Sequence, residues 1–68
     1  MDKPSRVLRF IMIYTDEHGY PPSVREIRDG CGLSSTSAAA YQIDKLVSDG
    51  RVRRTPGVAR GLVVQREV

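Results

Sequence analysis

Two adjacent prolines, Pro21 and Pro22, divide the first half of this 68-residue chain into separate helical segments. Gly19 precedes them at a position suited to ending a helix, and neither proline allows that helix to continue. Ser23 and Glu26 follow with the spacing of a capping box, in which each side chain binds the backbone N–H of the other residue. One helix is therefore expected to end near Gly19 and another to start at Ser23.

The segment before the prolines is expected to form an amphipathic helix over about residues 3–17. Asp2 is its predicted N-cap, and the apolar residues that follow recur at helical spacing. Its predicted buried face comprises Val7, Leu8, Ile11, Tyr14 and Thr15, with Met12 and either Phe10 or Ile13 at the margin.

The second helix is expected to be short. Gly30 weakens it, and Gly32 can take the left-handed conformation that closes a helix. Its predicted apolar face comprises Val24, Ile27 and Cys31, and Leu33 is expected to plug the turn that follows.

The third helix is expected to run through TSAAAYQIDKLVSDG, with Ser34 or Ser35 as its cap and Gly50 at its end. Its apolar positions lie in the later turns or along one edge, at Ala39, Ile43, Leu46 and Val47. Its first two turns are expected to expose Thr36, Ser37, Ala38, Ala40 and Tyr41. This helix thus combines a buried rear half with a small, polar leading end.

The last part of the chain has the features of a basic β-hairpin. Val52 and the run Leu62-Val63-Val64 are β-branched or apolar, and the residues TPGVARG between them favour a turn. Residues 1–49 carry six basic and seven acidic side chains, whereas residues 50–68 carry five arginines and one glutamate. The predicted fold is mainly α with a small β-hairpin: a winged helix-turn-helix of three helices and a two-stranded wing.

Chain length and composition limit the possible function classes. Sixty-eight residues form one domain, taken here as residues 1–68. The single cysteine, Cys31, has no partner for a disulfide and no zinc-binding spacing, and no apolar run approaches a membrane span. We therefore expect a cytoplasmic protein without a metal, a cofactor, a membrane partner or a small-molecule ligand. The only histidine, His18, lies at a helix end, so an enzyme is not expected.

The leading end of the third helix suits the major groove of duplex DNA. In a helix-turn-helix, the second helix of the pair enters that groove with its N-terminal residues on base edges. Small side chains allow a close approach, hydroxyls bind base edges, and methyl groups pack on thymine. The alternative is that the alanines only favour helix formation and the serines only cap it.

The arginines of the hairpin suit the phosphate backbone. Arg53, Arg54 and Arg60 could neutralise phosphates or enter the minor groove. The alternative is that they discourage edge-to-edge strand pairing, a role that Arg51 and Arg66 fit nearly as well.

Several stretches, in order and at matching intervals, closely resemble the N-terminal DNA-binding domain of the LexA repressor family, the regulators of the SOS response. These stretches are GYPPSVREI, GLSSTS, IDKLVSDG and VRRTPGVARGL, together with the opening helix. The resemblance implies a sequence-specific transcriptional regulator, most simply a repressor, that binds a double-stranded DNA operator at the bacterial or phage nucleoid. It also allows for a homodimer on DNA. It also implies that the third helix reads bases while the wing and second helix hold the backbone.

Carried over by position, the resemblance implies two sets of site residues. The base-reading set is Ser35, Thr36, Ser37, Ala38, Ala40 and Tyr41. The backbone and wing set is Ser23, Arg25, Arg53, Arg54 and Arg60.

The chain also departs from the family pattern. Ala40 and Tyr41 stand where many members have longer polar or charged residues, so the operator is not fixed by the resemblance. Tyr41 could reach a phosphate, stack in the groove or fold onto the core. Arg28 stands where a small residue is usual, so either its side chain extends outward or the helix pair packs differently.

Two other functions remain open at this stage. Members of the family continue into a self-cleaving peptidase and dimerisation domain, for which these residues contain no candidate Ser/Lys pair. The chain could thus be the DNA-binding domain of a longer repressor, and on its own it is expected neither to sense DNA damage by self-cleavage nor to have that dimer interface. The other possibility is a protein-interaction module on a winged-helix scaffold, against which the wing arginines count.

Overall fold

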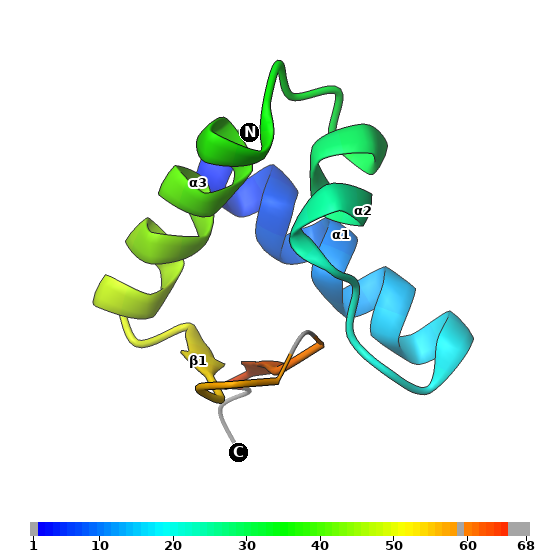
Figure 1. The fold of residues 1–68 in the computed structure, drawn as a ribbon. Helices are drawn as coiled ribbons and strands as arrows, with labels where there is room; N and C mark the ends of the chain where they lie inside the picture. Colours follow the sequence, from blue (N-terminus) through cyan, green and yellow to red (C-terminus); the bar gives the residue numbers. More distant parts are fainter. Residues whose placement is uncertain (1, 59, 66–68) are drawn as a thin grey trace.

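The computed structural model describes residues 2–58 and 60–65, so Arg66 lies outside the described residues. Three helices precede two short strands (Figure 1): α1 (Lys3–His18), α2 (Val24–Gly30), α3 (Thr36–Ser48), β1 (Val52–Arg54) and β2 (Leu62–Val64). The strands pair antiparallel, with Arg53 opposite Val63. The predicted mainly helical fold with a two-stranded wing is confirmed.

The helix boundaries follow from local capping chemistry. Asp2 caps α1, and the predicted capping box is formed: Ser23 N–H donates to Glu26 Oε1 at 2.8 Å and Glu26 N–H donates to Ser23 Oγ at 3.2 Å. Ser35, rather than Ser34, caps α3, because its Oγ accepts from Ala38 N–H at 3.1 Å. These contacts satisfy amides that have no partner within the helices.

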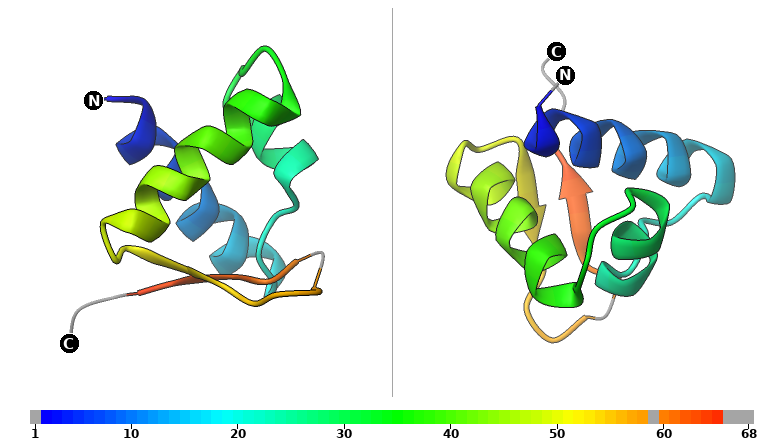
Figure 2. Two further views of the ribbon diagram at one scale, coloured as in Figure 1. Left: turned by 60° about the vertical axis from the view of Figure 1, so that its left-hand side comes forward. Right: turned by 90° about the horizontal axis from the view of Figure 1, so that it is seen from above.

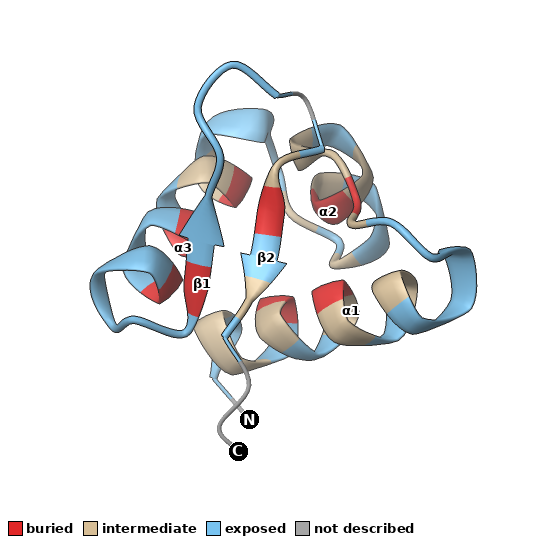
Figure 3. Ribbon diagram, turned by 90° about the horizontal axis from the view of Figure 1, so that it is seen from below, coloured by how far each residue is buried: buried red, intermediate tan, exposed pale blue. Residues whose placement is uncertain are grey.

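The core lies between the three helices and the inner face of the wing (Figure 3). Its buried apolar members are Val7, Ile11, Ile27, Ala39, Ile43, Leu46, Val52 and Leu62. Leu8, Phe10, Val24, Cys31, Leu33 and Val64 are partly buried against them. Of the two marginal candidates on α1, Phe10 therefore packs on the core, whereas Ile13 is 46% exposed.

Three residues predicted on the buried face of α1 are only half-buried: Leu8, Tyr14 and Thr15. Leu8 packs partly against the core. Thr15 satisfies its own hydroxyl by donating to the Ile11 carbonyl at 2.7 Å, and the Tyr14 hydroxyl reaches across to Glu26. Both side chains thus lie at the rim of the core, where a polar group can find a partner.

On α3, Val47 was expected to be buried and is 36% exposed, whereas the polar Gln42 is only 8% exposed. Successive residues of an α-helix are rotated by about 100° around its axis. Ala39, Ile43 and Leu46 set the centre of the buried stripe, and Gln42 and Val47 each lie about 70° from it, on opposite sides. The difference in burial therefore comes from the neighbouring elements: Gln42 faces the start of α1 and the turn before α3, whereas Val47 lies on the side of β1. The side-chain oxygen of Gln42 has no hydrogen-bond partner among the described residues.

Close packing of α1 and α2 depends on Gly30. A Cβ atom built at this glycine would overlap the ring of Phe10. Gly30 was expected only to weaken α2, but it also leaves space for the aromatic ring. Arg28 extends outward, and its Nε donates to Asp29 Oδ1 at 2.7 Å, so this unusual residue does not disturb the helix pair.

The arrangement leaves one face of the molecule distinct from the rest. The loop of the wing lies on the side opposite α1, and α2 and α3 lie on either side between them (Figure 2, right; Figure 3).

No helix within residues 2–58 and 60–65 is both long and apolar enough to cross a membrane.

Candidate nucleic-acid interface

The leading end of α3 carries the predicted base-reading residues. Ser35, Thr36, Ser37 and Tyr41 are exposed there. The Ser35 oxygen already accepts the Ala38 amide, which leaves its hydroxyl hydrogen free to donate outward. The first turn thus presents three hydroxyl groups and no bulky side chain.

Ala38 and Ala40 are half-buried, although they were expected to be exposed. A methyl group stands close to the helix surface, so adjacent side chains cover part of it. Ala38 also lines a shallow hollow with Cys31 and Leu33 from the turn before α3. The methyl groups therefore remain partly accessible from outside, but less so than the serines and Tyr41.

Tyr41 projects from the second turn of α3 and is 58% exposed. It does not fold onto the core, which removes one of the three roles considered for it. The ammonium group of Lys45 lies 5.1 Å from the centre of its ring, within the range of a cation–π contact. Lys45 was not among the predicted site residues, although its spacing of four from Tyr41 places both on one helix face.

The start of α2 lies next to the leading end of α3. Ser23, Val24 and Arg25 line a shallow surface hollow together with Thr36. Arg25 is exposed and makes no ion pair with any described residue, whereas Ser23 is half-buried by its role as the cap. The two helices therefore present an exposed guanidinium beside the hydroxyl groups of α3.

The wing arginines differ in how they are held. Arg53 points to solvent from β1 and makes no ion pair within the described part of the chain. Arg54 Nη1 lies 2.9 Å from Asp44 Oδ1 of α3, with side chains that are 44% and 65% exposed. Because exposed ion pairs of this kind contribute little, Arg54 can readily exchange Asp44 for another anion.

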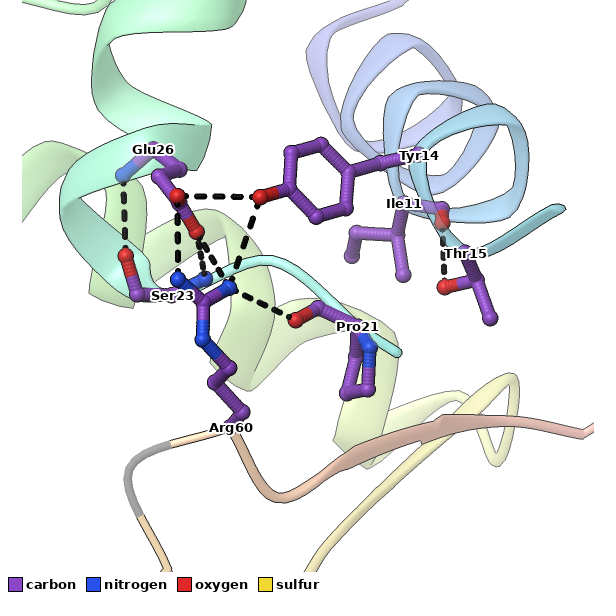
Figure 4. Close-up of polar contacts among 7 residues, drawn as sticks. All are labelled: Ile11, Tyr14, Thr15, Pro21, Ser23, Glu26 and Arg60. Carbon is purple, nitrogen blue, oxygen red and sulfur yellow. Dashed lines mark hydrogen bonds and ion pairs between the residues drawn. The ribbon is translucent and has the colours of Figure 1, made fainter. Parts of the chain in front are cut away.

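Arg60 is directed toward the helices (Figure 4). Its Nη1 donates to Glu26 Oε1 at 2.6 Å and its Nη2 to Glu26 Oε2 at 3.1 Å. Nη1 also donates to the Pro21 carbonyl at 3.1 Å and lies 3.4 Å from the Tyr14 hydroxyl. The guanidinium carbon is 4.8 Å from the centre of the Tyr20 ring. Arg60 thus joins the wing to the body of the domain.

These contacts shift the pKa values of Glu26, Arg60 and Tyr14. The hydrogen bonds from Arg60, followed by the capping bond from Ser23, lower the pKa of Glu26 to about 2. The same carboxylate raises the pKa of Arg60. Burial, followed by the bond to Glu26, raises the pKa of Tyr14. At neutral pH, Glu26 is therefore a carboxylate paired with a permanent cation.

Sequence reasoning missed the partners of Arg60. It assigned Tyr14 to the core and Glu26 to the cap of α2 alone. Arg60 and Glu26 are 34 residues apart, and no local pattern connects positions at that distance. Only the three-dimensional arrangement of the wing against α2 brings them together.

His18 and Cys31, which carry potentially reactive side chains, both pack against neighbouring residues. His18 stacks on Tyr14 with ring centres 4.0 Å apart, at the end of α1. Burial raises the pKa of the Cys31 thiol, which packs partly against the core. Within residues 2–58 and 60–65, no group of three or more histidine, cysteine, aspartate or glutamate side chains could hold a metal ion.

The sequence of this chain is similar to those of a known family of proteins. Residues 2–61 match the LexA DNA binding domain family. The chain is 49% identical to the LexA repressor of Roseiflexus sp. (strain RS-1) over 59 residues, which is 87% of this chain and 27% of that protein. It is 44% identical to the LexA repressor of Corynebacterium efficiens over 64 residues, or 94% of this chain and 28% of that protein. With the LexA repressor of Clostridium botulinum (strain Hall) the identity is 39%, over 94% of this chain and 32% of that protein. The chain therefore spans about a third or less of the length of these relatives.

Proposed function

The chain belongs to the LexA DNA-binding domain family, and we propose that it binds double-stranded operator DNA sequence-specifically and represses transcription. The observation that carries this proposal is the face formed by the leading end of α3, the start of α2 and the wing. Hydroxyl groups, exposed guanidinium groups and small side chains meet there, on the side away from α1. We further propose that it acts at the bacterial or phage nucleoid, in the response to DNA damage.

In this account α3 enters the major groove with its N-terminal residues first. The proposed base-reading residues are Ser35, Thr36, Ser37, Ala38, Ala40 and Tyr41. Serine and threonine hydroxyls can donate to or accept from base edges, and the recessed alanine methyl groups leave clearance for a base pair or contact a thymine methyl. Tyr41 reaches furthest from the helix, so it is placed to contact a flanking base or phosphate.

The phosphate backbone is held from the two sides of α3. The proposed phosphate contacts are Ser23, Arg25, Arg53 and Arg54, and Arg60 lies at the base of the wing beside them. Arg25 and Arg53 make no ion pair with any described residue, and Arg54 has a weakly held partner, so these three can bind phosphate directly. Ser23 lies at the N-terminus of α2, where backbone N–H groups favour an anion.

A domain of this size makes few base contacts, so tight binding requires a second copy on the DNA. We propose that two copies bind an inverted repeat, each reading one half-site with its α3. This arrangement would give the repressor its affinity without further base contacts within one domain.

The test is an NMR titration of the ¹⁵N-labelled chain with duplex DNA at low salt. We expect amide shifts at residues 35–41 of α3, at residues 23–25 and in the wing, and an affinity that falls steeply as salt is added. Binding that is insensitive to salt would contradict the electrostatic part of the proposal. Unshifted amides throughout α3 would contradict DNA reading and favour a protein-interaction module.

A further inference from the structure

Tyr14, Glu26 and Arg60, called the wing clasp from here on, connect α1, α2 and the wing in one hydrogen-bonded group (Figure 4). The Tyr14 hydroxyl donates to Glu26 Oε2 at 2.9 Å, and Ser23 N–H donates to Oε1 at 2.8 Å. Both carboxylate oxygens of Glu26 are thus held by hydrogen bonds from residues other than Arg60. Arg60 then binds both of them, a bidentate geometry that specifies orientation as well as distance.

The wing needs such an attachment because it has little stability of its own. Its strands have three residues each, and an isolated two-stranded hairpin is marginal in water. Val52 and Leu62 anchor the strands in the core, but the loop between them extends away from it. Arg60 lies beside the neck of this loop, where Thr55 N–H donates to the Gly61 carbonyl at 2.8 Å. The clasp therefore holds the loop at its base.

We propose that Glu26 is a positioning residue for DNA binding, which fixes the wing through Arg60 so that other wing groups meet the backbone while α3 lies in the groove. This inference rests on the proposed function. It assigns Arg60 a role within the protein in place of the direct phosphate contact considered above. Glu26 itself need not touch DNA.

The effect of removing the Glu26 charge distinguishes this role from simple electrostatics. A carboxylate near a DNA-binding face repels phosphate, so its loss should strengthen binding if charge alone matters. If Glu26 positions the wing, its loss weakens binding instead. Glu26→Gln is suited to this comparison because glutamine also serves at this position of a capping box.

The experiment measures the affinity of the full chain and its variants for one duplex by fluorescence anisotropy, at a temperature where circular dichroism shows each variant folded. We expect Glu26→Gln to weaken binding about fivefold, within the range observed for residues coupled in one network. Binding by Glu26→Gln that equals or exceeds that of the unmodified chain would overturn the inference.

Asp44→Asn is the matched control. It also removes one carboxylate paired with a wing arginine, but Asp44 is 65% exposed and makes only one bond to Arg54. We expect binding to stay the same or to tighten, because Arg54 is released and a negative charge is lost. If Asp44→Asn weakens DNA binding as much as Glu26→Gln does, the loss follows from disturbing any paired wing arginine. That result would overturn the specific role of the clasp.

Arg60→Gln tests the same contact from the wing and leaves the capping box of α2 intact, so it serves if Glu26→Gln does not fold. In a double-mutant cycle the losses of affinity should not add, because both changes break one interaction. If Arg60 instead contacts phosphate independently, the losses add and the inference fails. If the unmodified chain binds no duplex, the proposed function fails and the inference fails with it, whereas normal binding by Arg60→Gln removes the inference alone.

Discussion

The carboxylate of Glu26 and the guanidinium of Arg60 are joined by two hydrogen bonds, of 2.6 and 3.1 Å, across 34 residues of sequence. This contact, followed by the capping bond from Ser23, lowers the pKa of Glu26 from an ordinary value of 4.5 to about 2 in the folded protein. A carboxyl group with a depressed pKa stabilises the fold above its unfolded pKa, and this contribution disappears as it becomes protonated. The contact therefore links the position of the wing to acid stability.

We expect the difference in thermal midpoint between the unmodified chain and Glu26→Gln to shrink as the pH falls from about 4.5 to 2. Asp2 and Asp29 also have lowered pKa values, so both proteins lose stability in acid. Only the difference between the two melting curves isolates Glu26. A difference that stays constant from pH 6 to about 2 would show that the pair with Arg60 does not form in solution.

Substitutions on α3 and α2 should change DNA binding in different ways. Ser37→Ala removes a hydroxyl from the base-facing turn and should alter the relative affinities for duplexes that differ at single base pairs. Arg25→Gln should weaken all duplexes alike and reduce the slope of log affinity against log salt by about 0.9, because one phosphate contact is lost. Competition binding over a panel of duplexes at several salt concentrations measures both effects. A uniform loss for Ser37→Ala would argue against base reading at that position.

The centre and the edge of the buried stripe on α3 predict different costs of truncation. Ile43 is fully buried, so Ile43→Ala should lower the free energy of unfolding by about 2–5 kcal/mol. Val47→Ala should change it by less than about 1 kcal/mol, because Val47 is partly exposed at the edge of the stripe. Urea unfolding followed by circular dichroism measures both. Equal losses would mean that the last turn of α3 is packed differently.

The Cys31 thiol should react slowly with alkylating reagents. Burial raises its pKa, which reduces the thiolate that reacts at neutral pH, and the side chain packs partly against the core. We expect the rate with iodoacetamide at about pH 8 to be several times lower than for an unstructured cysteine peptide. A rate equal to that of the peptide would indicate an exposed, unperturbed thiol.

The features predicted correctly from sequence depend on neighbours along the chain. The caps of the helices, the break at Pro21 and Pro22 and the closing glycine at position 32 are local, and the structure confirms them. The exposed hydroxyls of α3 follow in the same way, because the small residues come directly after a cap.

The features that sequence reasoning missed depend on how elements meet. Gly30 needs the ring of Phe10 to explain it, and the burial of Gln42 depends on which elements lie on that side of α3. The wing clasp requires three elements to come together. A glutamate in a capping box and an arginine in a basic loop each have a sufficient local explanation, so nothing in the sequence signals their contact.

The central claim is that α3 reads specific base pairs in duplex DNA, and selection from a random duplex pool tests it most directly. The unmodified chain and Ser37→Ala would each be carried through the same rounds of binding and sequencing. We predict that the unmodified chain enriches one short motif, arranged as an inverted repeat, and that Ser37→Ala changes the preferred base at one or two positions within each half. A pool that stays random after selection would contradict the claim. If Ser37→Ala selects the same motif as the unmodified chain, variants of the other proposed base-reading residues of α3 are selected in the same way. The same motif from all of these variants would also contradict the claim.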